Sequence, residues 1–230
     1  MLTSDIALTK GSASHALIAP DTDNEQPSFQ GTPFTGSFDG AGFTIAGLSI
    51  VAPVGADYLG LFGRTDNAHI KNLTLEGVSI VASGDSSHFI GALIGEQRGG
   101  QVSRCSAAGT LIVGTQGNFV GGLVGRLSEG QLVESFSTGL VTGSSDVGGL
   151  VGAADKCTAE GCFWDIQTSR TDVSAAGYRA TTKWCGASSP YGTCDVWRCH
   201  SVGIVVGTED CGGLIGSIMV GDPLRAPRHG

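Results

Sequence analysis

The chain has 230 residues, of which 38 are glycine, 40% are hydrophobic and 15% are charged. This length allows one large all-β domain or two small ones, and the glycines follow no three-residue period, which excludes collagen. Acidic residues outnumber basic ones by 21 to 13 and no basic stripe is present, so no nucleic-acid partner is expected. No apolar run approaches the roughly 20 residues that span a membrane.

The first 20 residues lack the basic and apolar regions of a signal peptide. The sequence therefore leaves two locations open: the protein is intracellular, or it is exported and its leader is absent from this chain.

Residues 1–56 are the least repetitive part of the chain. They contain four phenylalanines that could pack together: Phe29, Phe34, Phe38 and Phe43. Within them the stretch DTDNEQ places carboxylates at Asp21, Asp23 and Glu25, as in half of a calcium loop. Because the glycine and the distal glutamate of such a loop are missing, a solvated turn is the preferred interpretation and a metal site is the alternative.

Residues 57–165 repeat a short block in which apolar residues flank glycines. The block reads DYLGLFG, FIGALIG, FVGGLVG and DVGGLVG, and it returns later as DCGGLIG. The last glycines of the blocks lie 32, 30, 27 and 64 residues apart: Gly63, Gly95, Gly125, Gly152 and Gly216. Since 64 is twice 32, we expect one coil between the last two glycines to lack its block.

The register extends beyond the block. Seven residues after the first four block glycines the chain has Ile70, Val102, Leu132 and Ala159. Ten residues after them it has Leu73, Cys105, Ser135 and Cys162. The intervening segments are short and rich in β-branched residues, which predicts strands rather than helices.

A unit of about 30 residues with several short strands cannot bury its own apolar face, but it can bury that face against identical neighbours. We therefore predict that residues 1–230 form a single all-β domain, a parallel β-solenoid or β-helix of about six coils. Residues 1–56 would form an N-terminal cap and the first coil, because the open edge of a sheet needs protection. The block glycines would lie where the chain needs a positive φ or a close approach of two backbones.

Several stretches together resemble the GLUG-motif repeats of bacterial surface proteins. The resemblance rests on the pattern VGGLVG followed by SFSTG. The stretch PFTGSFDGAGFTIAGLSI resembles the coil that precedes such repeats. YLGLFGRTDNAHIKNLTLEGVSI resembles the next coil, and GCFWDIQTS resembles the segment that closes such an array. The resemblance covers roughly residues 1–180. It implies a β-solenoid stalk in secreted or cell-surface proteins, including adhesins, and it implies no catalytic residues.

Residues 166–198 interrupt the repeat, and the register resumes in residues 199–230. The interruption contains Trp184, Tyr191 and Trp197, so we expect an irregular loop that leaves the solenoid surface and contacts a ligand. Pro223 and Pro227 in the tail cannot donate to a strand ladder. Residues 199–230 are therefore predicted to form the last coil and a C-terminal cap.

The seven cysteines fall into two groups. Cys105, Cys162 and Cys199 share one repeat position with Ser135, and we expect a column of small buried side chains there. The other four lie around the interruption and could form disulfides whose pairing the sequence does not define: Cys157, Cys185, Cys194 and Cys211. A zinc site is a weaker alternative, because no C-x2-C pair is present.

No catalytic constellation, structural metal or cofactor site is predicted. Asp146, Asp155 and Asp165 fall at different repeat positions, so they do not form the paired carboxylates that glycoside cleavage needs. We expect a non-catalytic structural or adhesive module, extracellular or at the cell surface, that displays loops to a protein or glycan ligand and could self-assemble. Two alternatives remain open: a β-helix protein that binds or cleaves polysaccharide, and a structural assembly component of a virion, an envelope or the cell interior.

Overall fold

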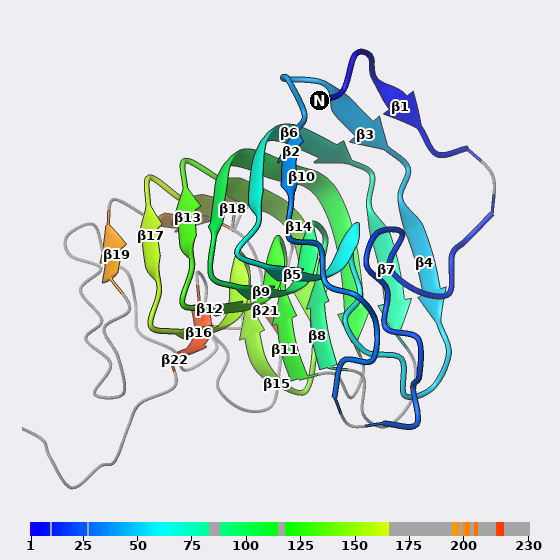
Figure 1. Ribbon diagram of the computed structural model, residues 1–230. Coiled ribbons are helices and arrows are strands. Elements are labelled where there is room, and N and C mark those ends of the chain that lie inside the picture. Colours follow the sequence, from blue (N-terminus) through cyan, green and yellow to red (C-terminus); the bar gives the residue numbers. More distant parts are fainter. Residues whose placement is uncertain are drawn as a thin grey trace, which may run out of the picture.

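The computed structural model describes residues 1–9, 11–26, 28–82, 88–114 and 118–165 and four later strands, β19 (Asp195–Trp197), β20 (His200–Val202), β21 (Val205–Val206) and β22 (Ile215–Ile218). Every regular element in these residues is a strand, and every strand pair between β1 and β22 is parallel. The strands wind into a β-solenoid of about four turns (Figure 1). This confirms the predicted all-β class and the parallel stacking.

Three sheets form the walls of the solenoid. The largest has 14 strands; besides β19, β20 and β21 these are β1 (Ile6–Ala7), β2 (Ser37–Asp39), β3 (Thr44–Ala46), β4 (Ser49–Ala52), β6 (His69–Glu76), β7 (Ser79–Ala82), β10 (Gln101–Gly114), β13 (Gln131–Val133), β14 (Phe136–Thr142), β17 (Thr158–Glu160) and β18 (Phe163–Asp165). The second contains β8 (His88–Gly91), β11 (Asn118–Gly121) and β15 (Ser145–Gly148). The third contains β5 (Phe62–Asp66), β9 (Ile94–Arg98), β12 (Val124–Ser128), β16 (Val151–Asp155) and β22.

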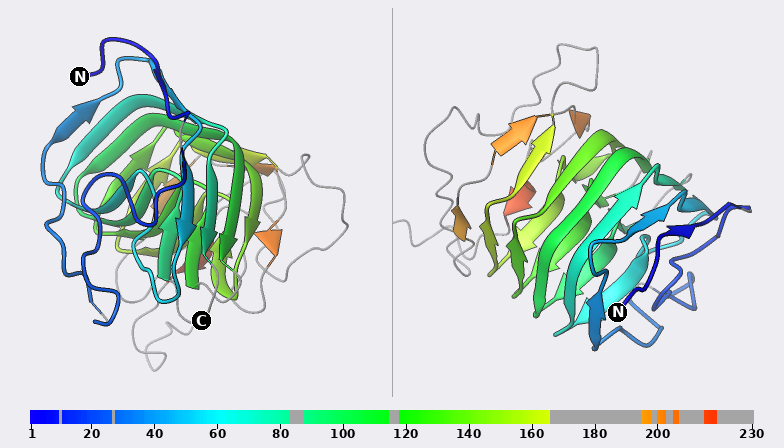
Figure 2. Two further views of the ribbon diagram at one scale, coloured as in Figure 1. Left: turned by 90° about the vertical axis from the view of Figure 1, so that its right-hand side faces the viewer. Right: turned by 90° about the horizontal axis from the view of Figure 1, so that it is seen from above.

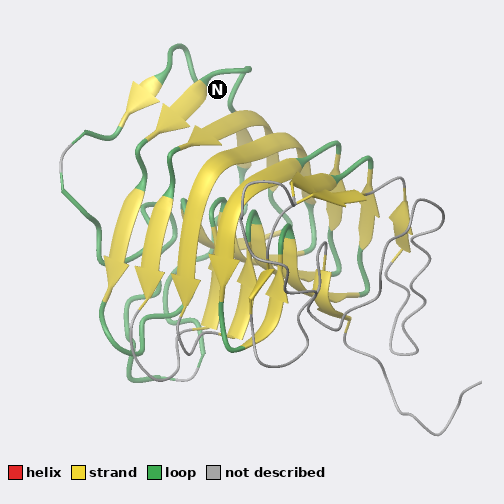
Figure 3. Ribbon diagram, turned by 180° about the vertical axis from the view of Figure 1, so that it is seen from behind, coloured by secondary structure: helices red, strands yellow, loops and turns green. Residues whose placement is uncertain are grey.

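One complete coil runs through β8, β9 and β10, and the next begins at β11, which pairs with β8. The two views in Figure 2 show the outline of the coils and their stacking along the axis. Seen from behind, in Figure 3, the drawn elements are strands joined by short loops. Accordingly, the described residues contain no helix of the length and apolarity that a bilayer crossing requires.

The strand register follows the spacing of the sequence blocks. Val102 pairs with Ile70 on one side and with Leu132 on the other, and Leu132 pairs with Ala159. In the third sheet, β16 pairs directly with β22, with Val151 opposite Ile215. The blocks that end at Gly152 and Gly216 are therefore direct neighbours in this sheet. This agrees with the expectation that the chain segment between them contributes no block of its own.

The apolar side chains inside the coils form one continuous core. Strand β7 illustrates the alternation, because Ile80 and Ala82 are fully buried whereas Ser79 and Val81 lie half-buried on the outer face. The largest fully buried side chains come from all parts of the repeat: Phe62, Leu73, Ile80, Leu93, Ile94 and Trp164 among them. A parallel stack gives each coil a neighbour above and below, which is how a short repeat buries these side chains.

The block glycines are required because two backbones meet there. A Cβ on Gly125 would lie 2.6 Å from the carbonyl oxygen of Gly95 and 2.7 Å from that of Phe119. Gly95 is equally close to the backbone of Gly63 and Phe89. At the first four block glycines, Gly63, Gly95, Gly125 and Gly152, backbones therefore pack with no side chain between them, and none of these four has a positive φ.

Positive φ angles occur instead at corners that mostly carry other residues. One corner column holds Tyr58, Phe89, Phe119 and Asp146, with φ between 50° and 59°. A second holds Asn72, Arg104, Glu134 and Gly161. The left-handed conformation costs a residue other than glycine roughly 1–2 kcal/mol. Contacts with the stacked neighbours must therefore stabilise these corners.

Residues 1–34 lie across the first regular coil. The Leu8 amide donates to the Ala46 carbonyl at 2.8 Å, and Ile18 and Phe34 form isolated bridges to Phe62 and Thr65. Most of this segment is irregular, and it meets the coil at separate points rather than along a continuous ladder. It occupies the end of the solenoid marked by β1 in Figure 1.

Candidate functional site

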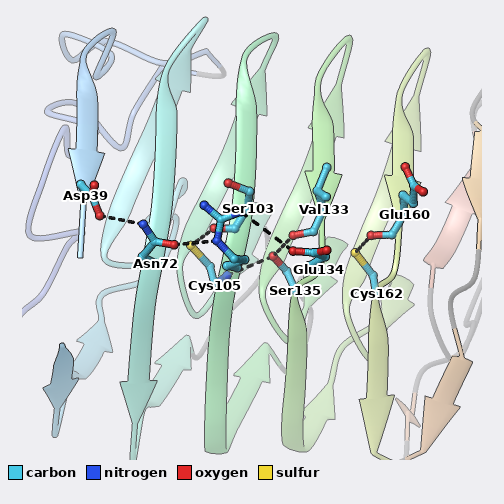
Figure 4. Close-up of polar contacts among 10 residues, drawn as sticks. Asp39, Asn72, Ser103, Cys105, Val133, Glu134, Ser135, Glu160 and Cys162 are labelled. Carbon is cyan, nitrogen blue, oxygen red and sulfur yellow. Dashed lines mark hydrogen bonds and ion pairs between the residues drawn. The ribbon is translucent and has the colours of Figure 1, made fainter. Parts of the chain in front are cut away.

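A column of polar side chains crosses four coils at the second corner. Asn72 Nδ2 donates to Asp39 Oδ1 at 3.0 Å, and Arg104 Nε donates to Asn72 Oδ1 at 2.7 Å. Arg104 Nη1 lies 3.9 Å from Glu134 Oε2 in the next coil. Figure 4 shows this column along the stacked strands.

The column holds charges as well as hydrogen bonds. The hydrogen bond from Asn72, the amide of Ala41 and the neighbouring Lys71 together lower the pKa of Asp39. The side chains are largely exposed, with 55% of Arg104 and 63% of Glu134 accessible, so the ion pair is weak. Its geometry links neighbouring coils at the surface.

The cysteine position lies directly inside this corner. Cys105 is 1% exposed and Cys162 is fully buried. The Cys105 amide donates to Ser135 Oγ at 3.1 Å, and Ser135 Oγ donates to the Val133 carbonyl at 2.8 Å. Burial raises the pKa of the Cys105 thiol to about 12, so this group acts as a small packing element rather than a nucleophile.

A buried charge column lies in the third sheet. Glu96 is 6% exposed, and its carboxylate lies 3.4 Å from Arg64 Nε and 3.8 Å from Arg126 Nη1. These three residues occupy the same position in successive coils. The glutamate therefore separates two arginines that would otherwise face each other.

Stacked aromatic rings cover this charge column. Tyr58 and Phe89 stack with ring centroids 4.7 Å apart, and Phe89 and Phe119 stack at 5.1 Å. The Arg126 guanidinium lies 5.8 Å from the Phe119 ring centroid. Burial, followed by the Glu96 carboxylate, raises the pKa of Tyr58 to about 12. This hydroxyl stays protonated at neutral pH.

The aromatic and charged columns were not predicted, although their signal is visible in the sequence. Tyr58 is the second residue of the first block, and Phe89 and Phe119 begin the next two blocks. The residue after each block glycine is Arg64, Glu96 or Arg126. Alternating charges at one repeat position are the pattern that would have indicated this column.

The acidic stretch near the N-terminus forms a turn. Asp21 Oδ1 accepts the amides of Thr22 and Gln30, at 2.9 and 2.8 Å, and Asp23 Oδ1 accepts the amide of Glu25 at 3.0 Å. Within the described part of the chain, no three His, Cys, Asp or Glu side chains are grouped so that they could hold a metal ion.

Two of the three predicted ligand-contact residues, Trp184 and Tyr191, lie outside the described residues. Four of the cysteines predicted to form disulfides or the buried column also lie outside them: Cys185, Cys194, Cys199 and Cys211. Trp197 belongs to β19, which pairs with β17. Cys157 is 2% exposed at the edge of the described repeat, and a disulfide between it and a later cysteine stays a prediction.

The described geometry defines a parallel β-solenoid whose corners carry columns of matched side chains. No family model and no solved structure matches the chain. Among curated proteins it is similar to Halomucin of Haloquadratum walsbyi, with 35% identity over 139 residues. The similarity covers 60% of this chain and 1% of Halomucin, so the chain spans only a small part of that relative's length.

Proposed function

We propose that the chain is a non-catalytic structural module of a surface protein, a rigid β-solenoid that displays loops to a protein or glycan ligand. The observation that carries this proposal is the matching of side chains between coils. Asp39, Asn72, Arg104 and Glu134 connect four coils at one corner, while Glu96 bridges two arginines in the third sheet. Linked coils resist bending, as a stalk requires.

The ends of the stack have protective roles in this proposal. The module has about six coils, with residues 1–56 as the N-terminal cap and first coil and residues 199–230 as the last coil and C-terminal cap. The hydrogen bonds of Leu8 and Ile18 to the first regular coil support the N-terminal role. Covered edges limit unwanted strand addition.

The proposed location is the cell surface or the extracellular space. The resemblance of the blocks to GLUG-motif repeats of adhesin-type proteins supports it. The partial similarity to Halomucin supports it independently of that resemblance. In this proposal residues 166–198 provide the ligand contact, and the regular coils of residues 57–165 provide the support.

A loop-exchange experiment tests the proposal. Residues 166–194 are replaced by a short Gly-Ser linker, and binding to a glycan array and to intact cells is measured beside thermal unfolding. We expect binding to be lost while the far-UV circular dichroism and the melting temperature are retained. Retained binding would exclude residues 166–194 as the contact, and a collapsed melting transition would assign them to the solenoid itself.

The two alternative functions give different results in parallel assays. A polysaccharide-cleaving β-helix would release reducing ends from a polysaccharide panel. The buried Glu96 of this chain is paired with two arginines, and we expect no release of reducing ends. A virion or envelope component would form stable oligomers, which light scattering detects.

A further inference from the structure

Two buried carboxylates, one on each side, lie near the contact between the N-terminal segment and the first regular coil, and the charge of Asp21 acts on Asp57. Asp21 is 3% exposed and Asp57 is 8% exposed. Asp57 Oδ1 accepts the His88 amide at 2.6 Å. Asp21 Oδ1 holds the turn at residues 21–30, whereas its Oδ2 is buried without a hydrogen-bond partner.

Several contacts join the two sides of this interface. The Phe29 ring meets the Tyr58 ring edge-on at 5.0 Å. The Ile18 amide donates to the Leu61 carbonyl at 2.9 Å, and the Phe34 amide donates to the Arg64 carbonyl at 3.0 Å. Docking of the segment therefore buries both carboxylates together.

Two charged groups act on Asp57: Asp21 of the N-terminal segment and His88 of β8. Arg64 of β5 and Glu96 of β9 act on the adjacent Tyr58. Neither Asp21 nor Asp57 forms an ion pair with a lysine or arginine of the described residues. Burying the Asp57 carboxylate without a paired cation disfavours its ionised form, which raises its pKa.

We propose that this contact is a proton-sensitive latch: the N-terminal segment docks more tightly on the first coil when Asp57 is protonated, and less tightly when Asp57 is ionised. Burial is the largest influence on Asp57 and raises its pKa, and the charge of Asp21 acts in the same direction. The amide hydrogen bond and the charge of His88 oppose the rise without cancelling it.

The direction of the pH effect follows from proton linkage. Asp57 binds a proton more tightly in the docked state than in the open state, where its pKa returns towards 3.8. Docking is therefore strongest at pH values below the raised pKa, and it weakens as the pH rises through that value. Each unit of pKa difference changes the opening equilibrium about tenfold.

Amide hydrogen exchange of the full chain tests the latch. The amides of Ile18 and Phe34 report docking, and the amide of Leu93, bonded to the Leu123 carbonyl inside the regular coils, reports the solenoid. After correction for intrinsic exchange, we expect protection of Ile18 and Phe34 to fall as the pH rises through the raised pKa of Asp57. Protection of Leu93 should not follow this trend.

Two substitutions separate the latch from general acid effects. Asp57→Asn keeps an acceptor for the His88 amide but cannot ionise, so the pH dependence at Ile18 and Phe34 should disappear. Asp23→Asn is the matched control, because Asp23 is exposed in the same segment, and the dependence should persist. Asp21→Asn removes the facing charge and should reduce the dependence. Flat protection in the unmodified protein, or an unchanged slope in both Asp57→Asn and Asp21→Asn, would overturn the proposal.

Discussion

Replacing the block glycine Gly125 by alanine should destabilise the solenoid more than its single added methyl group suggests. The new Cβ would lie 2.6 Å from the Gly95 oxygen, 2.6 Å from the Ile90 nitrogen and 2.7 Å from the Phe119 oxygen. All three are backbone atoms, and they belong to two coils. No side-chain rotation can relieve the overlap, so both arms of the block and the neighbouring coil have to separate.

Overpacking of this kind usually costs about 1–3 kcal/mol, and we expect at least the upper value because only backbone can move. For a domain of this size, about 3 kcal/mol lowers the melting temperature by roughly 6–12 °C. Thermal unfolding followed by far-UV circular dichroism measures this shift. Urea unfolding at one temperature gives the free energy of unfolding directly.

Gly77→Asn is the matched control. Gly77 has φ +58° and no atom within 4 Å of a built Cβ, and asparagine tolerates the left-handed conformation. We expect a change under about 1 kcal/mol there. If Gly125→Ala also costs less than about 1 kcal/mol, the close approach of backbones is not what requires glycine in the block.

Three further predictions concern the columns. Glu96→Gln leaves two arginines facing a neutral amide and should lower the free energy of unfolding in urea by about 3 kcal/mol. Glu129→Gln breaks an exposed pair with Lys156 and should lower it by less than about 1 kcal/mol. Equal losses would show that burial does not matter at Glu96. The Asn72→Ala variant should be about 1 kcal/mol less stable than the Asn72→Gly variant, because both lose the column contacts but only alanine opposes the positive φ. If the glycine variant were the less stable of the two, the positive φ at this corner would not be a source of strain. The pKa of the Cys105 thiol is raised to about 12, so this thiol should resist alkylation at pH about 8 until denaturant is added. Peptide mass mapping measures the alkylation. Modification of Cys105 in the folded chain would contradict its burial.

The repeat made the fold predictable. Apolar residues such as Ile70, Val102 and Leu132 return at one position, and a parallel stack is the arrangement that buries them together. The register therefore followed from counting residues between glycines. The sequence left two roles open for those glycines, because a close approach of two backbones and a positive φ both favour glycine. Only the structure shows that the close approach of backbones applies.

The corner columns were harder to predict, because their logic lies between coils and not within one. Asn72, Arg104 and Glu134 look unrelated when each coil is compared with the next for similarity. They are complementary rather than similar, and a search for repeated letters misses complementarity. The same holds for Glu96. It differs from the arginines on both sides because its negative charge complements theirs.

This complementarity gives the columns a further role. The apolar positions of neighbouring coils are nearly interchangeable, so the core alone tolerates a slip by one coil. Such a slip would place Arg64 against Arg126, which are separated by Glu96 in the native stack. Like charges directly opposite on adjacent strands are destabilising, and both arginine side chains are only partly exposed. The apolar core thus stabilises stacking in general, while the charged column selects the order of the coils.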